Sequence, residues 1–247
     1  MRLSRRVTAV AVAGGAALVA ATFVVPSTAT AAPAPAPATA VTTAAVTTAA
    51  VTTAAAVPAT AAHHPLGTTP LSDTAAAFAS SFDEDWNDFN IVSHAVFAVL
   101  AAKPKSPVGV LTDGRKPLTA FLPTDRAFQS LVYQKTGMFV ENEQDVFKAV
   151  AGLGIDTVEA VLLYHVVPGV TIPAAVALKA NGARLRTAQG QKIVVQVLGT
   201  KKNPVIRLVD ANRYNADPTV NLAQTDINSG NRQIAHGISQ VLLPAGA

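Results

Sequence analysis

The segment Thr119-Ala-Phe-Leu-Pro-Thr-Asp-Arg-Ala-Phe128 decides how the folded part of this chain is interpreted. Its first residues continue a short apolar run, and Leu118 to Leu122 is predicted to be a strand. The Pro-Thr-Asp sequence then turns the chain, and the side-chain oxygen of Thr124 or Asp125 is placed to cap a following helix. That helix is predicted to end at Gly137, since glycine adopts the left-handed conformation that often follows a last helical turn. The segment therefore predicts a strand that turns directly into a helix.

A second informative segment is Leu162-Leu-Tyr-His-Val-Val-Pro-Gly169. It ends a helix predicted to begin at Asp156, where Glu159 follows three residues later as in a capping box. Val158, Leu162 and His165 fall on one apolar face of this helix. A lone histidine on such a face is usually a hydrogen-bonded core residue, because an unpaired imidazole is costly to bury. The spacing therefore favours a structural role for His165.

The remaining pattern changes from helical periodicity to alternation along the chain. Before Gly182 the apolar residues recur at helical spacing, and after it they alternate as in strands. Further helices are expected near residues 90–103, 146–150 and 173–181, and strands at 183–187, 192–198, 205–209 and about 233–243. Helices followed by strands indicate an α+β fold, with N-terminal helices packed against antiparallel strands.

The N-terminus has the three regions of a secretory signal peptide. Three arginines at positions 2, 5 and 6 precede an apolar run from Val7 to Val25, and Ala29-Thr-Ala31 offers a cleavage site. We assign residues 1–31 to the signal peptide, with a retained transmembrane anchor as the alternative. No stable membrane span is expected after cleavage. The arrangement is typical of a bacterial secretory protein, and Sec and twin-arginine export both stay open.

A linker follows the signal peptide. Residues 32–75 are rich in Ala, Pro and Thr and contain three copies of Val-Thr-Thr-Ala-Ala. Such a segment has few large apolar side chains to offset its ordering entropy, so it is predicted to be disordered. Its threonines are candidates for O-linked sugars. The folded domain is predicted to be residues 76–247, long enough to bury a substantial core.

Charge and motif content exclude several classes of function. Loss of residues 1–31 removes three of the 19 Lys and Arg residues, which leaves 16 basic against 15 acidic side chains. This balance argues against a nucleic-acid partner, which would need a basic surface. The chain has no cysteine, so it has neither disulfides nor thiolate metal sites. Neither Gly-x-Ser-x-Gly nor His-Glu-x-x-His occurs, and no cofactor, metal or catalytic residue is assigned.

One enzymatic alternative rests on scattered carboxylates. Asp125, Asp156, Glu159 and Asp226 would form an acid–base site only if the fold brought them together. The sequence cannot bring them together by itself. A secreted hydrolase with a carboxylate site therefore stays open as an alternative.

Together the quoted segments resemble the fasciclin-domain family, an extracellular adhesion and binding module. Thr119 to Phe128 matches the family's first signature, Leu163 to Gly169 the second, and Asp226-Ile227 with Val241-Leu-Leu-Pro244 its closing segment. The resemblance implies a single fasciclin-like domain whose strands form a β wedge. It also assigns a structural role to Thr119, Phe121, Pro123, Thr124, Asp125, Phe128 and His236. Two departures are Ser229-Gly-Asn-Arg232 in place of an Asn-Gly hairpin, and Gly237 in place of a bulky apolar residue.

The resemblance also implies a function. It points to a secreted, non-enzymatic adhesion module of the extracellular space or cell envelope, which binds cell-surface or matrix proteins or polysaccharides as a monomer or a weak self-associate. The binding positions carried over from the family are Tyr164, His165, Asp226 and Ile227. Besides the hydrolase, a passive envelope protein without a specific ligand is an alternative. His165 and Ile227 also have a competing interpretation, in which they only hold the fold.

Overall fold

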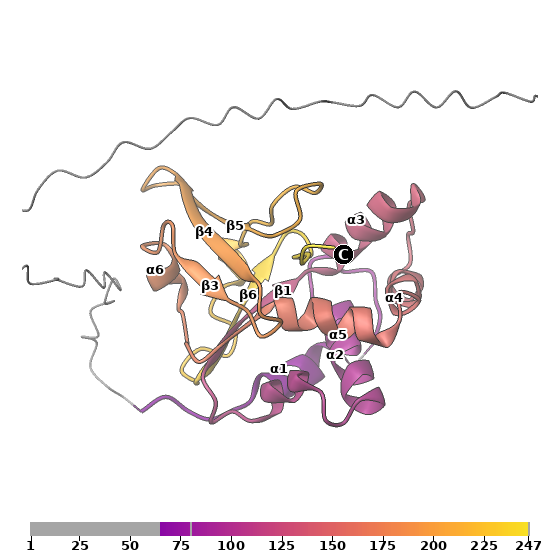
Figure 1. Ribbon diagram of the computed structural model, residues 1–247, viewed down its shortest axis with the longest axis horizontal. Coiled ribbons are helices and arrows are strands. Elements are labelled where there is room, and N and C mark those ends of the chain that lie inside the picture. Colours follow the sequence, from indigo (N-terminus) through magenta and orange to yellow (C-terminus); the bar gives the residue numbers. More distant parts are fainter. Residues whose placement is uncertain (1–64, 80, 247) are drawn as a thin grey trace, which may run out of the picture. The chain divides into compact units, whose positions relative to one another are not determined.

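The computed structural model describes residues 65–79 and 81–246, which form helices and two small sheets (Figure 1). The predicted signal peptide and the linker up to residue 64 lie outside the described residues. No helix among the described residues is long and apolar enough to cross a membrane.

Apart from the strand at residues 118–123, the described strands follow most of the helices in the sequence, as the periodicity predicted. The helices are α1 (Leu71–Phe78), α2 (Asn90–Ala102), α3 (Asp125–Thr136), α4 (Glu143–Ala151), α5 (Ile155–Tyr164) and α6 (Ala174–Ala177), with 3-10 turns η1 (Pro107–Thr112) and η2 (Leu222–Gln224). Helix α3 ends at Gly137 in the left-handed conformation, with φ of 72°. The predicted end of this helix is therefore confirmed.

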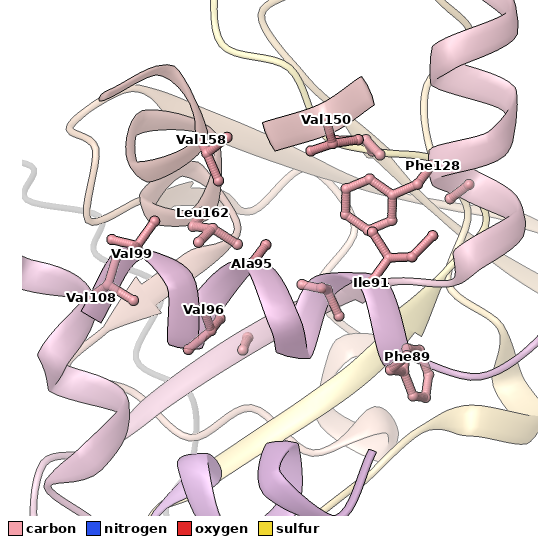
Figure 2. Close-up of a cluster of buried hydrophobic side chains, with 14 of the residues drawn as sticks. Phe89, Ile91, Ala95, Val96, Val99, Val108, Phe128, Val150, Val158 and Leu162 are labelled. Carbon is pink, nitrogen blue, oxygen red and sulfur yellow. The ribbon is translucent and has the colours of Figure 1, made fainter. Parts of the chain in front are cut away.

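Helix α2 runs through the middle of the helical core. Its buried residues include Ile91, Ala95 and Val99. They face several neighbouring helices at once. Figure 2 shows these side chains together with Phe128, Val150 and Leu162, which come from α3, α4 and α5. Burying one such side chain contributes about 1.5–3 kcal/mol, so this cluster stabilises the helical half of the domain.

The strands form two three-stranded sheets. In the first sheet the order is β2 (Val166–Pro168), β1 (Leu118–Pro123) and β6 (Gln233–Ile238). The second contains β3 (Arg184–Arg186), β4 (Lys192–Gly199) and β5 (Pro204–Val209), all antiparallel. The α+β class is confirmed. The expectation of antiparallel strands is wrong for one pair, because β6 returns to lie parallel to β1 with His236 opposite Phe121.

Strand β1 separates two hydrophobic cores. Because successive side chains of a strand point to opposite faces, Leu118 and Ala120 join the helical core, whereas Phe121 joins the core between the sheets. Tyr164 and Ile238 lie in that second core. The signature segment therefore positions both halves of the domain relative to each other.

Ordered structure begins before the predicted boundary at residue 76. Gly67 pairs with Asn231, and Leu71 is buried in the helical core. A Cβ atom on Gly114 would lie 1.8 Å from the carbonyl oxygen of Thr68, so the N-terminal segment passes directly over this glycine. The last part of the predicted linker therefore packs onto the domain. The composition did not predict this packing, because Leu71 is the one fully buried apolar side chain of an alanine-rich helix.

Two sequence predictions of local structure are wrong. The final strand ends at Ile238, and the residues up to Leu243 contact the two cores as an irregular segment. Helix α5 begins after Gly154 and has no capping box, since Asp156 and Glu159 both bind the ammonium group of Lys103. These two side chains form an ion pair with Lys103 instead of the capping hydrogen bonds that the sequence suggested.

Candidate functional site

Tyr164, the first of the expected binding positions, is fully buried, with 0% of its surface exposed. Its hydroxyl donates to the carbonyl oxygen of Lys192 at 3.2 Å and accepts from the backbone nitrogen of Ala211 at 3.0 Å. Burial raises the pKa of Tyr164 to about 12. The ring and the hydroxyl thus connect the end of α5 to the second sheet.

His165 is also internal, with 4% of its surface exposed. Its Nδ1 lies 2.7 Å from the carbonyl oxygen of Val161, and its Nε2 accepts from the backbone nitrogen of Leu242 at 3.0 Å. A carbonyl only accepts and an amide only donates, so the proton resides on Nδ1. Burial lowers the pKa of His165 to about 4, so the ring is neutral near pH 7.

Asp226 and Ile227 lie on a half-buried turn beside His236. The backbone nitrogen of Asp226 donates to Nδ1 of His236 at 3.2 Å, and Nε2 of His236 donates to the carbonyl oxygen of Ile172 at 2.8 Å. Burial lowers the pKa of His236. Oδ1 of Asp226 accepts from the backbone nitrogen of Ala174 at 2.9 Å, at the start of α6. Ile227 exchanges two backbone hydrogen bonds with Ala235 and packs against the helical core.

The structure places these positions in two groups on either side of β1. The backbone nitrogen of Phe121 donates to the carbonyl oxygen of His165 at 2.9 Å, and the Phe121 ring lies 6.2 Å from the ring of His236. Within residues 65–79 and 81–246 no hydrogen bond joins Tyr164 or His165 to Asp226 or Ile227. The two groups therefore do not form one polar site.

The polar side chain of the signature residue Thr119 also forms hydrogen bonds within the fold. The hydroxyl of Thr119 donates to the carbonyl oxygen of Val170 and accepts from the backbone nitrogen of Ile172, both at 2.9 Å. Phe128 is buried in the helical core, and Pro123 ends β1. These contacts link β1 to the connection that follows β2.

Asp125 has a different role from the predicted one. Its carboxyl oxygens accept from the backbone nitrogens of Asn90 at 3.0 Å and Ile91 at 2.8 Å, so it caps α2 rather than its own helix. Thr124 occupies the cap position of α3 without a side-chain hydrogen bond. The prediction that either side chain caps α3 is therefore wrong, because α2 lies close enough to take the carboxyl group.

The carboxylates of the hydrolase alternative are not assembled into one site. Asp156 and Glu159 share Lys103. The carboxylate of Asp226 accepts a hydrogen bond from the start of α6, and that of Asp125 from the start of α2. Asp125 instead neighbours Asp88 and Glu143, two acids that the sequence interpretation missed and that form a cluster with Asp83. Burial, reinforced by the nearby negative charges, raises the pKa of Asp125 to about 9 and also raises those of Asp88 and Glu143. The closely spaced acids at positions 83, 85 and 88 were the available sequence signal.

An apolar cavity of the helical half has a volume of about 130 Å³. Figure 2 labels five of its lining residues, which are Ala95, Phe128, Val150, Val158 and Leu162. The only polar side chains in its walls are those of Lys135, Thr157 and His165, and none is a carboxylate. Two smaller cavities of about 30 and 20 Å³ also have no Asp or Glu in their walls. These cavities therefore offer mainly apolar contact and no pair of carboxylates.

The family assignment comes from the sequence match. A model of the fasciclin domain matches residues 92–244, which is more than half of the chain and runs from α2 to the residues after β6. The chain belongs to the fasciclin-domain family. Fasciclin domains are adhesion-related modules that are typically extracellular or attached to cell surfaces.

A search of curated proteins found no match. Among solved structures, the fasciclin domain is similar to a FAS1 domain pair from the insect cell adhesion molecule fasciclin I, with 16% sequence identity and a TM-score of 0.37. The similarity covers 62% of this chain and 43% of the insect chain, so less than half of that chain is matched.

Both departures of this fasciclin domain from the family pattern have a structural reason. A Cβ atom on Gly237 would lie 2.9 Å from Cβ of Gln224 and 3.0 Å from Cζ of Phe89, so a larger residue would require these side chains to shift. In the longer turn, the carbonyl oxygen of Gly230 accepts from Gly67, and the nitrogen of Arg232 donates to the carbonyl oxygen of Gly67. The extra turn residue thus helps to hold the N-terminal segment.

Proposed function

We propose that this fasciclin domain is the binding part of a secreted, non-enzymatic adhesion module that recognises a protein or polysaccharide at a cell surface or in a matrix. The observation that carries the proposal is the internal use of the signature's polar side chains. The side chains of Tyr164, His165 and His236 bond to backbone groups of the same domain. They support a surface rather than react with a substrate.

Asp226 is the expected position best placed to meet a partner. It lies half-buried on a turn with φ of 56°, and only its Oδ1 accepts a hydrogen bond from the described part of the chain. Oδ2 takes no hydrogen bond from residues 65–79 or 81–246 and is free to accept one from a hydroxyl or amide of a ligand. Ile227 supplies apolar surface next to it, while Tyr164 and His165 act from inside.

Secretion is part of the same proposal. Residues 1–31 have the pattern of a signal peptide, and the segment that follows has the composition of a disordered linker. Such a linker would hold the domain away from the cell envelope. We assign the mature protein to the extracellular space or the envelope, as a monomer or a weak self-associate.

Removing the charge of Asp226 is expected to weaken binding without unfolding the domain. Asn tolerates the left-handed conformation and keeps an oxygen for Ala174, whereas Ala loses that hydrogen bond. In a screen of the full chain against wall polysaccharides and secreted proteins, Asp226→Asn should lower the affinity for the retained ligand about tenfold or more, with an unchanged melting temperature. Asp226→Ala should lower both.

Glu141→Gln is the matched control, because it removes one exposed negative charge elsewhere. It should bind like the wild type. Unchanged affinity in Asp226→Asn would refute the site assignment. If the wild-type chain retains no ligand, the passive envelope protein becomes the better account, and turnover of a glycoside or ester would favour the hydrolase.

A further inference from the structure

An acidic cluster lies where the loop before α2 meets the start of α4. Asp83, Asp88 and Glu143 each place one oxygen within 4.8 Å of the others. We propose that these three side chains hold one calcium ion. The site is separate from the turn at Asp226 and does not depend on the proposed adhesion function.

The spacing fits a single shared cation. Calcium binds oxygen ligands at about 2.3–2.6 Å, so two oxygens on opposite sides of one ion lie about 4.6–5.2 Å apart. The three oxygens of the cluster satisfy this limit. Oxygen donors alone favour a hard cation such as calcium over zinc or copper. Waters and backbone carbonyls of the exposed loop can complete its six to eight ligands.

Glu143 provides the independent indication of a missing ligand. It is buried, with 1% of its surface exposed. Its Oε2 accepts from the backbone nitrogen of Asp83 at 3.0 Å, but its Oε1 has no hydrogen-bond partner among the described residues. Oδ1 of Asp88 is buried and lacks a partner in the same part of the chain. Leaving a buried carboxylate oxygen without a donor is costly, and a cation removes that cost.

The charges around the cluster also favour a bound cation. Asp125 lies beside the cluster, and no Lys or Arg in residues 65–79 and 81–246 forms an ion pair with any of these four acids. Several buried carboxyl groups without a counter-ion repel one another, so one must hold a proton or the group must bind a cation. A bound calcium ion would join the 81–89 loop to α4 and stabilise the first turn of α2.

The chain contains its own reporter for this site. Trp86 is the only tryptophan and lies in the loop between Asp83 and Asp88. Terbium replaces calcium at oxygen sites, and its emission rises when a nearby tryptophan is excited. We expect the full-length protein at pH 7.5 to give saturable terbium emission, which calcium displaces with a Kd of about 0.1–1 mM, as in extracellular calcium modules.

Three variants test the assignment. Glu143→Gln and Asp88→Asn should each weaken terbium and calcium binding at least tenfold, whereas Glu84→Gln, an exposed acid of the same loop, should not. Calcium should also raise the melting temperature of the wild type, relative to EDTA, but not that of Glu143→Gln. Absence of both signals in the wild type would overturn the proposal. Equal weakening by Glu84→Gln would do so too, because it would show diffuse attraction to a negative surface.

Discussion

Replacing His165 with alanine is expected to lower the free energy of unfolding by about 4 kcal/mol. The substitution removes both imidazole hydrogen bonds and leaves the backbone nitrogen of the buried Leu242 without its acceptor. It also enlarges the apolar cavity of about 130 Å³ that His165 lines. For a domain of this size the melting temperature should fall by about 8–16 °C, measured by circular dichroism.

Tyr164→Phe is the graded control for this prediction. It keeps the buried ring and removes only the hydroxyl, which contacts Lys192 and Ala211. Tyr164→Phe should lower the free energy of unfolding by about 1–2 kcal/mol. A His165→Ala variant that melts within about 2 °C of the wild type would show that the imidazole does not support the fold.

Replacing Asp125 with alanine is expected to lower the free energy of unfolding by about 3 kcal/mol, whereas Asp125→Asn should lower it by less than about 1 kcal/mol. Alanine leaves the buried backbone nitrogens of Asn90 and Ile91 without an acceptor, and asparagine keeps one oxygen for them. Asparagine, like the protonated carboxyl group, carries no negative charge beside Asp88 and Glu143. Urea unfolding of both variants at pH 7 checks the difference, and equal stability of the two would contradict the cap.

The difference in stability between Asp125→Asn and the wild type should depend on pH. The pKa of Asp125 rises from 3.8 to about 9 in the folded state, mainly because the group is buried. The folded state therefore holds a proton that the unfolded chain releases above about pH 4, and this contribution to stability is lost as the pH rises through 9. Asp125→Asn should consequently gain stability relative to the wild type between about pH 5 and pH 9.

Much of the fold could be predicted from the sequence because its signals are local. The helical spacing around Ile91, the glycine at 137 and the alternation after Gly182 each act over a few residues. The burial of His165 also followed from its apolar helical face. The parallel pairing of β1 with β6 did not, because it joins Phe121 to His236 across more than a hundred residues of chain.

The candidate sites were harder to predict because they depend on contacts between elements. Asp125 has the sequence position of a cap for α3, and only the approach of α2 directs it to Asn90 and Ile91. The cluster around Glu143 likewise joins a loop to a helix that lies far away in sequence. Asp226 lies on a half-buried turn that three separate segments create.

Histidine NMR can show whether the signature side chains hold the fold from inside. Nitrogen-15 shifts should show His165 with its proton on Nδ1 and His236 with its proton on Nε2. Because the pKa of His165 is lowered to about 4, its ring should stay neutral down to about pH 5. Titration of His165 near pH 6.5, or a rapidly exchanging mixture of its tautomers, would contradict the account, since either would place the ring in contact with solvent.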